Sequence, residues 1–583
     1  MRARKKKNTP TRLERHRDYI TDKIIPSQKP LFVEIGCGKG RFACGVAAKN
    51  DCDFYALEKI EDVAVIAVEK AAERDLKNLK FVLADANDLP LLCDPNTVDV
   101  IYLNFSDPWP RSRNAKRRLT HRDFIKSYLK LLKPGGIIKF KTDNKKLFDF
   151  SVCELLACGL ELFDYTENLH SSGIINEEMT EYEQRFSELG QPIYHVKAKE
   201  GKKMILKNAT VYNGEFEPVR ADVKISGERI DKIAPSIDGD QVVDLTGLTI
   251  IPGFVDIHIH GCGGADTGDK TVEALKTMSK TLVKNGVTSF CPTSMTLSHE
   301  ELLDIFENVN ASKKEVDGAY IQGVNMEGPF IAMSKKGAQN GDYVRNPDRK
   351  EFYNLYEQSG RVIKIVDIAP ECEGADDFIK NVQPYCPVSV AHTAAGYDEA
   401  CHAFELGCRH VTHLYNAQSG LTHRAPGVVG AVFDKSKELG IRAELICDGF
   451  HIHPAALRIA FNAVGEDNSV IVSDSMRAAG SHDGEYDLGG QVVYVNEGKA
   501  RLADGTIAAS TTNIYEEFKN VISYGIPFKQ ALKSATINPA KAIRVDTETG
   551  SVEEGKCADF VVLDNELNIK LVIVKGSVKI NNL

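Results

Sequence analysis

Eight short apolar runs, each followed by a stretch with helical patterning, fill much of the second half of the sequence. They are residues 254–259, 287–291, 320–325, 362–368, 388–391, 411–414, 444–447 and 469–473. Strands that alternate with helices are typical of a parallel sheet, because parallel neighbours need a crossover connection. Eight such units in succession predict a (β/α)8 barrel, the TIM-barrel fold, over about residues 251–545.

The segments on either side of the predicted barrel have a different pattern. Residues 204–250 and 546–583 contain short runs rich in β-branched residues, separated by turns. Such runs are typical of β-strands. We therefore expect both ends of the second part to join in one small β-sandwich subdomain, which makes residues 204–583 a single domain.

The first third of the chain is a separate α/β domain by the same reasoning, since 583 residues are too many for one domain. Helical stretches separate predicted strands at residues 31–35, 54–57, 81–83, 98–105 and 137–140. This alternation predicts a parallel, Rossmann-like sheet over residues 1–203. Residues 195–203 form a polar seam without a Gly/Ser-rich or Pro-rich spacer, so the two domains are joined almost directly.

Composition narrows the class of protein. Hydrophobic residues make up 43% and charged residues 27%, as in soluble globular proteins. No apolar run reaches the roughly 18 residues of a membrane span, and no secretory signal opens the chain. The 14 cysteines form no C-x-x-C pair and indicate reduced thiols. We therefore expect a cytoplasmic protein without membrane contact.

A glycine-rich loop follows the first predicted strand in the segment EIGCGKG. Glycines let the backbone turn tightly and approach a ligand closely. Acidic residues end this strand and the next two, where carboxylates can accept hydrogen bonds from ribose hydroxyls. A nucleoside cofactor is therefore predicted at this sheet edge, and the residues expected to hold it are Glu34, Gly36, Gly38, Gly40, Glu58 and Asp85.

Two further segments are more specific: NFSDPWPR at residues 104–111 and TEYEQRF at residues 180–186. With EIGCGKG and TDN at 142–144, they resemble the tRNA (guanine-N7-)-methyltransferase family over roughly residues 1–200. The resemblance implies S-adenosylmethionine bound by the residues above and by Asp107, which also orients guanine-46 for transfer to N7. It implies guanosine contacts from Arg111, Asp143, Thr180, Glu181, Tyr182 and Glu183. Arg111 stands where the family usually has Lys. The alternative is a tRNA-binding module without catalysis.

Basic residues suit the first domain to tRNA. Residues 1–203 are net positive, whereas the rest of the chain is net negative. Lys and Arg bind phosphates without reading sequence. We expect tRNA contacts from the first 17 residues and from Arg113, Lys116, Arg117 and Arg118, with a solvated surface as the alternative.

A metal site is indicated at one rim of the predicted barrel. His258 and His260 lie two apart on the first strand, so their imidazoles share a face. Further His and acidic residues stand at the ends of other strands, where barrel enzymes carry their active sites. The residues at these strand ends include Glu327, His392, His413 and Asp474, so His, Glu and Asp recur around one rim beside the pair His258 and His260. The isolated His402, His410 and His482 are interpreted as surface or structural residues.

This pattern, with EGPF at 327–330 and THLYNA at 412–417, resembles the amidohydrolases and, among them, the N-acetylglucosamine-6-phosphate deacetylase family. The resemblance implies that Glu327, His392 and His413 are metal ligands, and that Asp474 is the catalytic acid/base. With His258, His260 and Asp474, the predicted metal site has six residues for one or two divalent ions, zinc or iron. It implies that N-acetylglucosamine 6-phosphate is held by Ala338, Gln339, Asn416, Ala417, Arg424, His451 and Ile507. Gln339, often His in relatives, Asn325 and Ala509 depart from the pattern.

Alternatives remain for the second domain. Another hydrolase of this fold, acting on a cyclic amide or a nucleobase, would typically carry Lys in place of Glu327. His258 and His260 either hold a second ion or only hydrogen-bond around a single one. A homodimer through the barrel is expected. Taken together, the sequence predicts one polypeptide that carries two enzymes.

Overall fold

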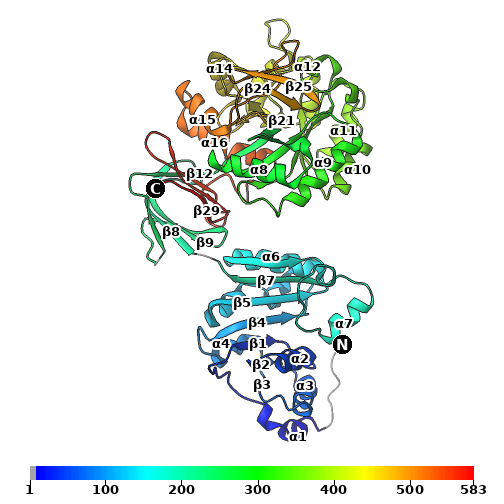
Figure 1. Ribbon diagram of the computed structural model, residues 1–583, viewed down its shortest axis with the longest axis vertical. Coiled ribbons are helices and arrows are strands. Elements are labelled where there is room, and N and C mark those ends of the chain that lie inside the picture. Colours follow the sequence, from blue (N-terminus) through cyan, green and yellow to red (C-terminus); the bar gives the residue numbers. More distant parts are fainter. Residues whose placement is uncertain (1–7, 202, 240) are drawn as a thin grey trace. The chain divides into compact units, whose positions relative to one another are not determined.

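The computed structural model describes residues 8–201, 203–239 and 241–583 (Figure 1). The described residues separate into two compact units. The first ends at Lys203 and also includes Ile225–Asp231, and the second contains Met204–Lys224 and Lys232–Leu583. Within the described ranges, no helix is both long enough and apolar enough to cross a membrane.

A seven-stranded sheet forms the centre of the first unit. Its order is β3 (Leu79–Val82), β2 (Asp53–Leu57), β1 (Leu31–Ile35), β4 (Val98–Asn104), β5 (Leu132–Thr142), β7 (Tyr194–Glu200) and β6 (Leu160–Thr166). The first five are parallel and β7 is antiparallel to both neighbours. The Rossmann-like fold is confirmed, while the pair β6 and β7 was not predicted.

Helices cover both faces of this sheet. Buried side chains of α2 (Arg41–Lys49) and α3 (Glu61–Glu73) form one apolar cluster with the sheet. Those of α5 (Arg122–Leu131) and α6 (Lys145–Ala157) form another. The strands are buried between the two layers, which is why they read as continuous apolar runs. Short helices α1 (Thr9–Glu14), α4 (Leu89–Leu92) and α7 (Glu181–Glu188) complete the unit.

Eight parallel strands form the barrel of the second unit and confirm the predicted fold (Figure 1). In order they are β13 (Phe254–Ile259), β16 (Val287–Ser294), β18 (Val324–Phe330), β19 (Ile363–Ile368), β20 (Val388–Val390), β21 (His410–Val411), β22 (Arg442–Leu445) and β23 (Ser469–Ile471). A bridge between Ile259 and Ser475 links the first strand to the segment after the last. The run predicted at 320–325 is divided between β17 (Tyr320–Ile321) and the start of β18.

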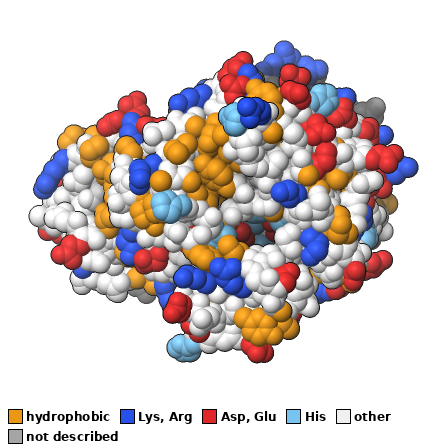
Figure 2. Space-filling model, turned by 90° about the horizontal axis from the view of Figure 1, so that it is seen from above, with side chains coloured by type: hydrophobic (Ala, Val, Ile, Leu, Met, Phe, Trp, Pro, Cys, Tyr) orange, Lys and Arg blue, Asp and Glu red, His pale blue; other side chains and the backbone are white. Residues whose placement is uncertain are grey.

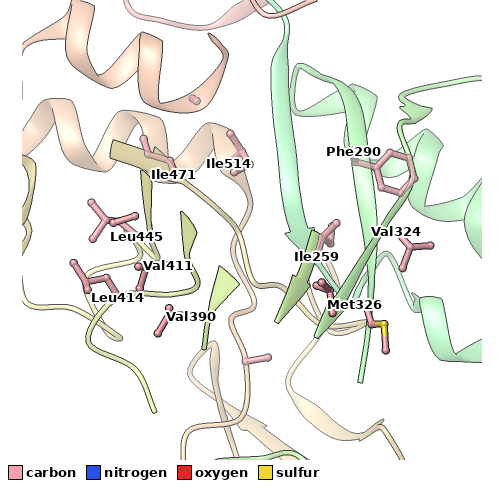
Figure 3. Packing of buried hydrophobic residues seen from close by; sticks show 14 of the residues in the cluster. Ile259, Phe290, Val324, Met326, Val390, Val411, Leu414, Leu445, Ile471 and Ile514 are labelled. Carbon is pink, nitrogen blue, oxygen red and sulfur yellow. The ribbon is translucent and has the colours of Figure 1, made fainter. Parts of the chain in front are cut away.

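Side chains from successive strands pack together in the core of this unit. Figure 3 shows Ile259, Val324, Val411 and Ile471 from different strands within one buried cluster. The helices that alternate with the strands are α8 (Val272–Lys284), α9 (His299–Ser312), α10 (Arg349–Gln358), α11 (Ala375–Val382), α12 (Tyr397–Leu406), α13 (Gly427–Leu439), α14 (Pro454–Val464), α15 (Ile514–Ser523), α16 (Phe528–Ala535) and α17 (Ile537–Ala542).

Both ends of the second part contribute to one eight-stranded sheet. It contains β8 (Lys203–Tyr212), β9 (Pro218–Ser226), β10 (Arg229–Ala234), β11 (Val242–Asp244), β12 (Thr249–Pro252), β27 (Phe560–Leu563), β28 (Ile569–Val574) and β29 (Ser577–Asn581). The pairing of β12 with β27 joins the two ends of the second part, as predicted. A three-stranded sheet of β24 (Gly484–Leu488), β25 (Gln491–Asn496) and β26 (Lys499–Arg501) follows the last barrel strand and was not predicted.

Candidate active sites

The glycine loop of the first unit lies at the carboxyl end of β1. Gly38 has a φ of 57°, and its N–H donates to Glu58 Oε2 over 3.1 Å. A Cβ at Gly40 would lie 2.5 Å from Ala67 Cβ, so no side chain fits between the loop and α3. A Cβ at Gly36 or Gly38 would have no atom within 4 Å. The loop therefore leaves room for a ligand beside Glu58.

Glu34 is buried next to this loop, and its Oε1 accepts a hydrogen bond from Asn104 over 2.8 Å. Burial raises the pKa of Glu34 to about 7, although the Asn104 bond and the charge of Lys141 oppose the rise. Asp85 is held differently, because the Asn87 N–H groups and Lys59 lower its pKa. The predicted cofactor carboxylates thus occur in distinct environments along one sheet edge.

The DPWP segment forms a loop after β4 in which Asp107 and Arg111 are exposed. Arg118 donates to the carbonyl oxygens of Pro108 and Trp109 over 3.0 and 3.1 Å. The guanidinium of Arg117 lies 5.0 Å from the centre of the Trp109 ring. Two members of the predicted basic cluster therefore also hold this loop, whereas Arg113 and Lys116 are exposed. Residues 1–7 of the predicted basic arm lie outside the described residues.

The TEYE segment begins α7, with Thr180 as the N-cap that accepts from the Glu183 N–H over 2.9 Å. Glu183 is fully buried and pairs with Lys141 Nζ at 2.8 Å. Glu181 pairs with Lys70 at 3.0 Å, while Tyr182 is exposed. Of the predicted guanosine contacts, Glu183 is therefore enclosed by the fold. Asp143 follows β5 and is half-buried.

In the second unit, the predicted metal ligands meet at the carboxyl rim of the barrel. His258 lies on β13 and Glu327 on β18, and the others follow directly after β13, β20, β21 and β23. All six are buried: His258, His260, Glu327, His392, His413 and Asp474. Among them, His392, His413 and Asp474 have φ values of 42°, 30° and 43°. Residues other than glycine rarely adopt these positive φ values, which persist where the surrounding structure enforces them.

Glu327 is the centre of this cluster. Its Oε1 lies 3.0 Å from Nε2 of His392 and 3.0 Å from Nε2 of His413. Its Oε2 lies 3.2 Å from His260 Nε2. Asp474 Oδ1 lies 3.4 Å from the same His260 nitrogen. The nitrogen atoms of His392 and His413 are only 3.1 Å apart, so several ligand atoms converge on a small volume.

An outer layer of acceptors orients the imidazoles. Glu444 on β22 accepts from His258 Nδ1 over 2.9 Å and pairs with His410 Nε2 at 2.8 Å. The Lys335 carbonyl lies 2.8 Å from His392 Nδ1. These contacts direct the opposite ring nitrogens towards Glu327. Our sequence analysis missed Glu444, although an acid at the start of the apolar run predicted at residues 444–447 was the available signal.

Charge within the cluster is strongly coupled. Burial opposes the charge of Glu327, yet the surrounding imidazoles, His258 foremost, hold its pKa well below the usual range. Burial likewise opposes a charged His260, but hydrogen bonds to Asp474 and Glu327 raise its pKa to about 9. Burial also opposes the charge of Asp474, whose pKa is lowered by His258 and His260. The site therefore stabilises positive charge next to two carboxylates.

These donors fit a divalent cation. Two groups have ligand atoms within 4.8 Å of one another: His258, His260 and Glu327, and Glu327, His392 and His413. Among the described residues, the buried His258 Nε2 has no hydrogen-bond partner, which suits a metal ligand. Imidazole nitrogen with carboxylate oxygen is a donor set that zinc and iron accept. Glu327 belongs to both groups: its Oε1 faces His258, His392 and His413, and its Oε2 faces His260.

Gln339 fixes the second oxygen of Glu327. Its Nε2 donates to Glu327 Oε2 over 2.7 Å, and its Oε1 accepts from the Thr296 N–H over 2.7 Å. Because the Thr296 N–H can only donate, the amide oxygen of Gln339 must face it. The amide nitrogen is thereby directed at Glu327. Gln339 is buried, so both contacts are shielded from water.

A cavity of about 370 Å³ opens onto the cluster. Figure 2 shows a hollow in which acidic and His side chains are visible and near which Lys and Arg side chains stand. Most of the predicted substrate contacts line the cavity: Ala338, Gln339, Asn416, Ala417, His451 and Ile507. Arg424 is exposed and does not line it. Lys335 does line it and was missed by the sequence analysis, since nothing marks it within KKGAQN.

Two family models match this chain, one in each part. An amidohydrolase family model matches residues 249–579. The chain belongs to the amidohydrolase family. A second family model, that of a methyltransferase, matches residues 28–196 and confirms the resemblance of the first part. Each of the two compact units therefore contains one of the two family matches.

The relatives of this amidohydrolase chain include sugar-phosphate deacetylases. It is 33% identical to N-acetylglucosamine-6-phosphate deacetylase of Lysinibacillus sphaericus, over 65% of this chain and 98% of the relative. It is 32% identical to N-acetylgalactosamine-6-phosphate deacetylase of Escherichia coli O157:H7, over 58% and 89%. The crystal structure of N-acetylglucosamine-6-phosphate deacetylase from Pasteurella multocida aligns with a TM-score of 0.61 and 30% identity, covering 65% of this chain and all of that one.

Proposed function

We propose that this chain carries two enzymes. The second part would hydrolyse N-acetylglucosamine 6-phosphate to glucosamine 6-phosphate and acetate with a divalent metal. The first part would transfer methyl from S-adenosylmethionine to N7 of guanine-46 in tRNA. For the deacetylase, the observation that carries the proposal is the convergence of three imidazoles and two carboxylates on one cavity, with the fully buried His258 next to both carboxylates.

In the deacetylase, Glu327, His392 and His413 would hold the ion, and His258 and His260 would add ligands for a second one. When bound, the metal supplies Lewis acidity that lowers the pKa of water and polarises a carbonyl. Asp474 is the proton carrier: its lowered pKa keeps it ionised near neutral pH, as a base must be. It would accept the proton of the attacking water and deliver it to the leaving amine.

The shape of the cavity supports a small substrate. Its volume of about 370 Å³ lies in the range of small-molecule sites. Asn416 and His451 line it and offer polar groups for sugar hydroxyls. His451 is oriented by Asp448, whose Oδ2 lies 2.6 Å from its Nδ1. Glu327 also favours this reaction over that of the cyclic-amide hydrolases, in which Lys is expected at the position.

Acetate release tests the deacetylase directly. The purified full-length chain should release acetate from N-acetylglucosamine 6-phosphate, and Asp474→Asn should lower the rate by several orders of magnitude. His402→Gln is the matched control, because His402 is exposed and pairs with the exposed Asp376, away from the cavity lining. N-Acetylgalactosamine 6-phosphate and a cyclic amide serve as competing substrates. Faster turnover of the cyclic amide would contradict the proposal.

For the methyltransferase, guanine N7 has a free lone pair in the neutral base, so no strong base is required. Catalysis would depend on positioning N7 in line with the methyl group. The loop of Gly36 and Gly38 leaves space for the cofactor beside Glu58. Asp107 is exposed on the neighbouring loop, where it is accessible to both cofactor and base.

Two measurements separate this enzyme from a tRNA-binding module. Asp107→Ala should abolish methyl transfer to tRNA while tRNA retention on a filter stays near the wild-type level. Asp149→Ala, which removes an exposed helix carboxylate paired with Lys145, should leave transfer unchanged. Retention without transfer by the wild-type chain would favour the binding module, and full product from Asp107→Ala would exclude the assigned role.

The two domains are also proposed to work independently, with the boundary between residues 203 and 204. The seam lacks a long linker or a shared motif. Residues 204–583 expressed alone should deacetylate at the full-length rate, and the dimer expected through the barrel should persist in that fragment. Loss of activity in a folded fragment would show that the domains depend on each other.

A further inference from the structure

We infer that Glu371 is a positioning residue for the candidate metal ligand His392. This inference rests on the proposed deacetylase function and names a residue that acts on the cluster from outside the cavity. Glu371 follows β19 and is half-buried. It is not among the described residues that line the cavity. Its effect on the site must therefore pass through the residues that it contacts.

The carboxylate of Glu371 binds the turn that directly follows His392. Its Oε1 accepts from the Ala394 N–H over 2.6 Å, and its Oε2 accepts from the Thr393 hydroxyl. Thr393 is fully buried, so the second bond is shielded from water. Hydrogen bonds to a carboxylate are roughly twice as strong as those between neutral groups. One side chain thus fixes both residues that follow His392.

Strand pairing explains why Glu371 reaches this turn. β19 and β20 are parallel neighbours, with Ile368 opposite Val390. Glu371 stands three residues after Ile368, and Thr393 stands three residues after Val390. The two segments leave the rim together, since the Ala391 N–H donates to the Ile368 carbonyl over 2.9 Å. The register of the strands therefore brings the carboxylate and the turn together.

The same turn is connected to the wall of the cavity. The Thr393 N–H donates to the Ala417 carbonyl over 3.0 Å, and Ala417 lines the cavity. Thr393 therefore links Glu371 to the loop predicted to hold the sugar. His392 and Ala417 have φ values of 42° and 51°. Because such values persist only where the surroundings enforce them, loss of the Glu371 contacts should loosen both residues.

The test compares Glu371→Ala, Glu371→Gln and the control Glu373→Ala in the full-length chain. Glu373 lies in the same loop, has the same charge and is exposed. Zn²⁺ affinity is titrated against a competing chelator. KM and kcat are measured with N-acetylglucosamine 6-phosphate at saturating Zn²⁺.

Glu371→Ala should weaken Zn²⁺ binding about tenfold or more, as is typical for residues that support metal ligands. It should also raise KM, because Ala417 moves with the turn. Glu371→Gln should stay within about threefold of the wild type, since its amide oxygen can accept from the Ala394 N–H while its NH2 group donates to Thr393 Oγ1. Glu373→Ala should match the wild type.

A purely structural role would give a different result. A smaller folded fraction lowers the apparent kcat, whereas KM and Zn²⁺ affinity keep their wild-type values. Wild-type KM and Zn²⁺ affinity in Glu371→Ala therefore overturn the inference. Equal losses in Glu371→Ala and Glu371→Gln also overturn it, because charge rather than hydrogen bonding would then be the cause. If Glu371→Ala does not fold, Thr393→Val replaces it: the same pattern at smaller size supports the inference, and wild-type values overturn it.

Hydrogen exchange separates this inference from the proposed reaction. In the metal-stripped full-length chain, a peptide that covers residues 391–397 is followed by mass spectrometry. Its protected amides should exchange about tenfold faster in Glu371→Ala, as expected for loss of a hydrogen bond to a charged group, but not in Glu371→Gln or Glu373→Ala. That result supports the role of Glu371 even if the wild type releases no acetate, and then only the proposed reaction fails. Unchanged exchange in Glu371→Ala overturns the inference.

Discussion

Gln339 offers the sharpest test of how the cluster is held. Replacing it with Ala removes the hydrogen bond to Glu327 Oε2 and the acceptor of the Thr296 N–H. Glu327 then loses the contact that fixes its second oxygen. Because Glu327 belongs to both groups of candidate ligands, any freedom in its carboxylate affects the whole metal site.

The size of the effect follows from the geometry. A hydrogen bond to a charged group contributes about 1.5–3 kcal/mol when buried, and the Gln339 contact is short, charged and shielded. At about 1.4 kcal/mol per factor of ten, this corresponds to about tenfold to hundredfold in metal affinity. Mutations of residues that support metal ligands typically fall in the same range. A water molecule entering the vacated space would keep the loss near the lower end.

The assay is metal binding by the full-length chain, stripped with a chelator and titrated with Zn²⁺ against a competing chelator. Gln339→Ala should weaken binding by the stated factor. Gln339→His should retain most of the affinity, because an imidazole N–H can donate to the same oxygen. Gln358→Ala, at an exposed helix end, is the control. Wild-type affinity in Gln339→Ala would refute the reasoning.

Three further outcomes are expected. Metal analysis should find above one equivalent in the wild type, falling towards one in the double variant His258→Gln/His260→Asn; an unchanged content would exclude a second site. Lys141→Met removes the lysine partner of the buried Glu183, which keeps its contacts with Asn176 and His170, and should destabilise the first unit by about 3 kcal/mol, measured in urea by fluorescence of the single tryptophan. Burial lowers the pKa of His195 from 6.5 to about 4. The contribution of neutral His195 to the free energy of unfolding is therefore fully present above about pH 6.5, and about 3 kcal/mol in all is lost as the pH falls towards 4. His195→Phe should flatten that dependence, and an equal slope in both proteins would contradict it.

The barrel could be predicted because its strands are buried on both faces and therefore read as uninterrupted apolar runs. Every residue of β13 and β16 is buried, for example. The same physics explains what was missed. Strands β24 and β25 are largely exposed, with buried positions only at intervals, so their sequence lacks an apolar run. Strand β6 has one buried residue at its start and was overlooked for the same reason.

The candidate metal site was predictable to the extent that the fold alone brings residues together. Strand ends of a barrel meet at one rim, so His258, Glu327 and His413 could be grouped from their positions along the chain. Arg424 could not be excluded from the cavity by such an argument, because it lies in a loop whose course the strand pattern does not determine. Lys335 was overlooked for the converse reason, since it lies in a loop that does enter the cavity.

The strand pattern alone was enough to predict that Glu444 has a buried partner. Within Arg442–Leu445, successive side chains point to opposite sides of the strand, towards the barrel interior or towards the helices. Both sides are buried in a parallel barrel, so an acid at this position costs several kcal/mol unless it is paired. The sequence therefore required a partner for Glu444 without naming it. The structure supplies two, His410 from the preceding barrel strand and His258 from the first one, far away along the chain. A charged residue within a strand that is otherwise buried thus indicates a polar network near the site, and the fold decides which residues complete it.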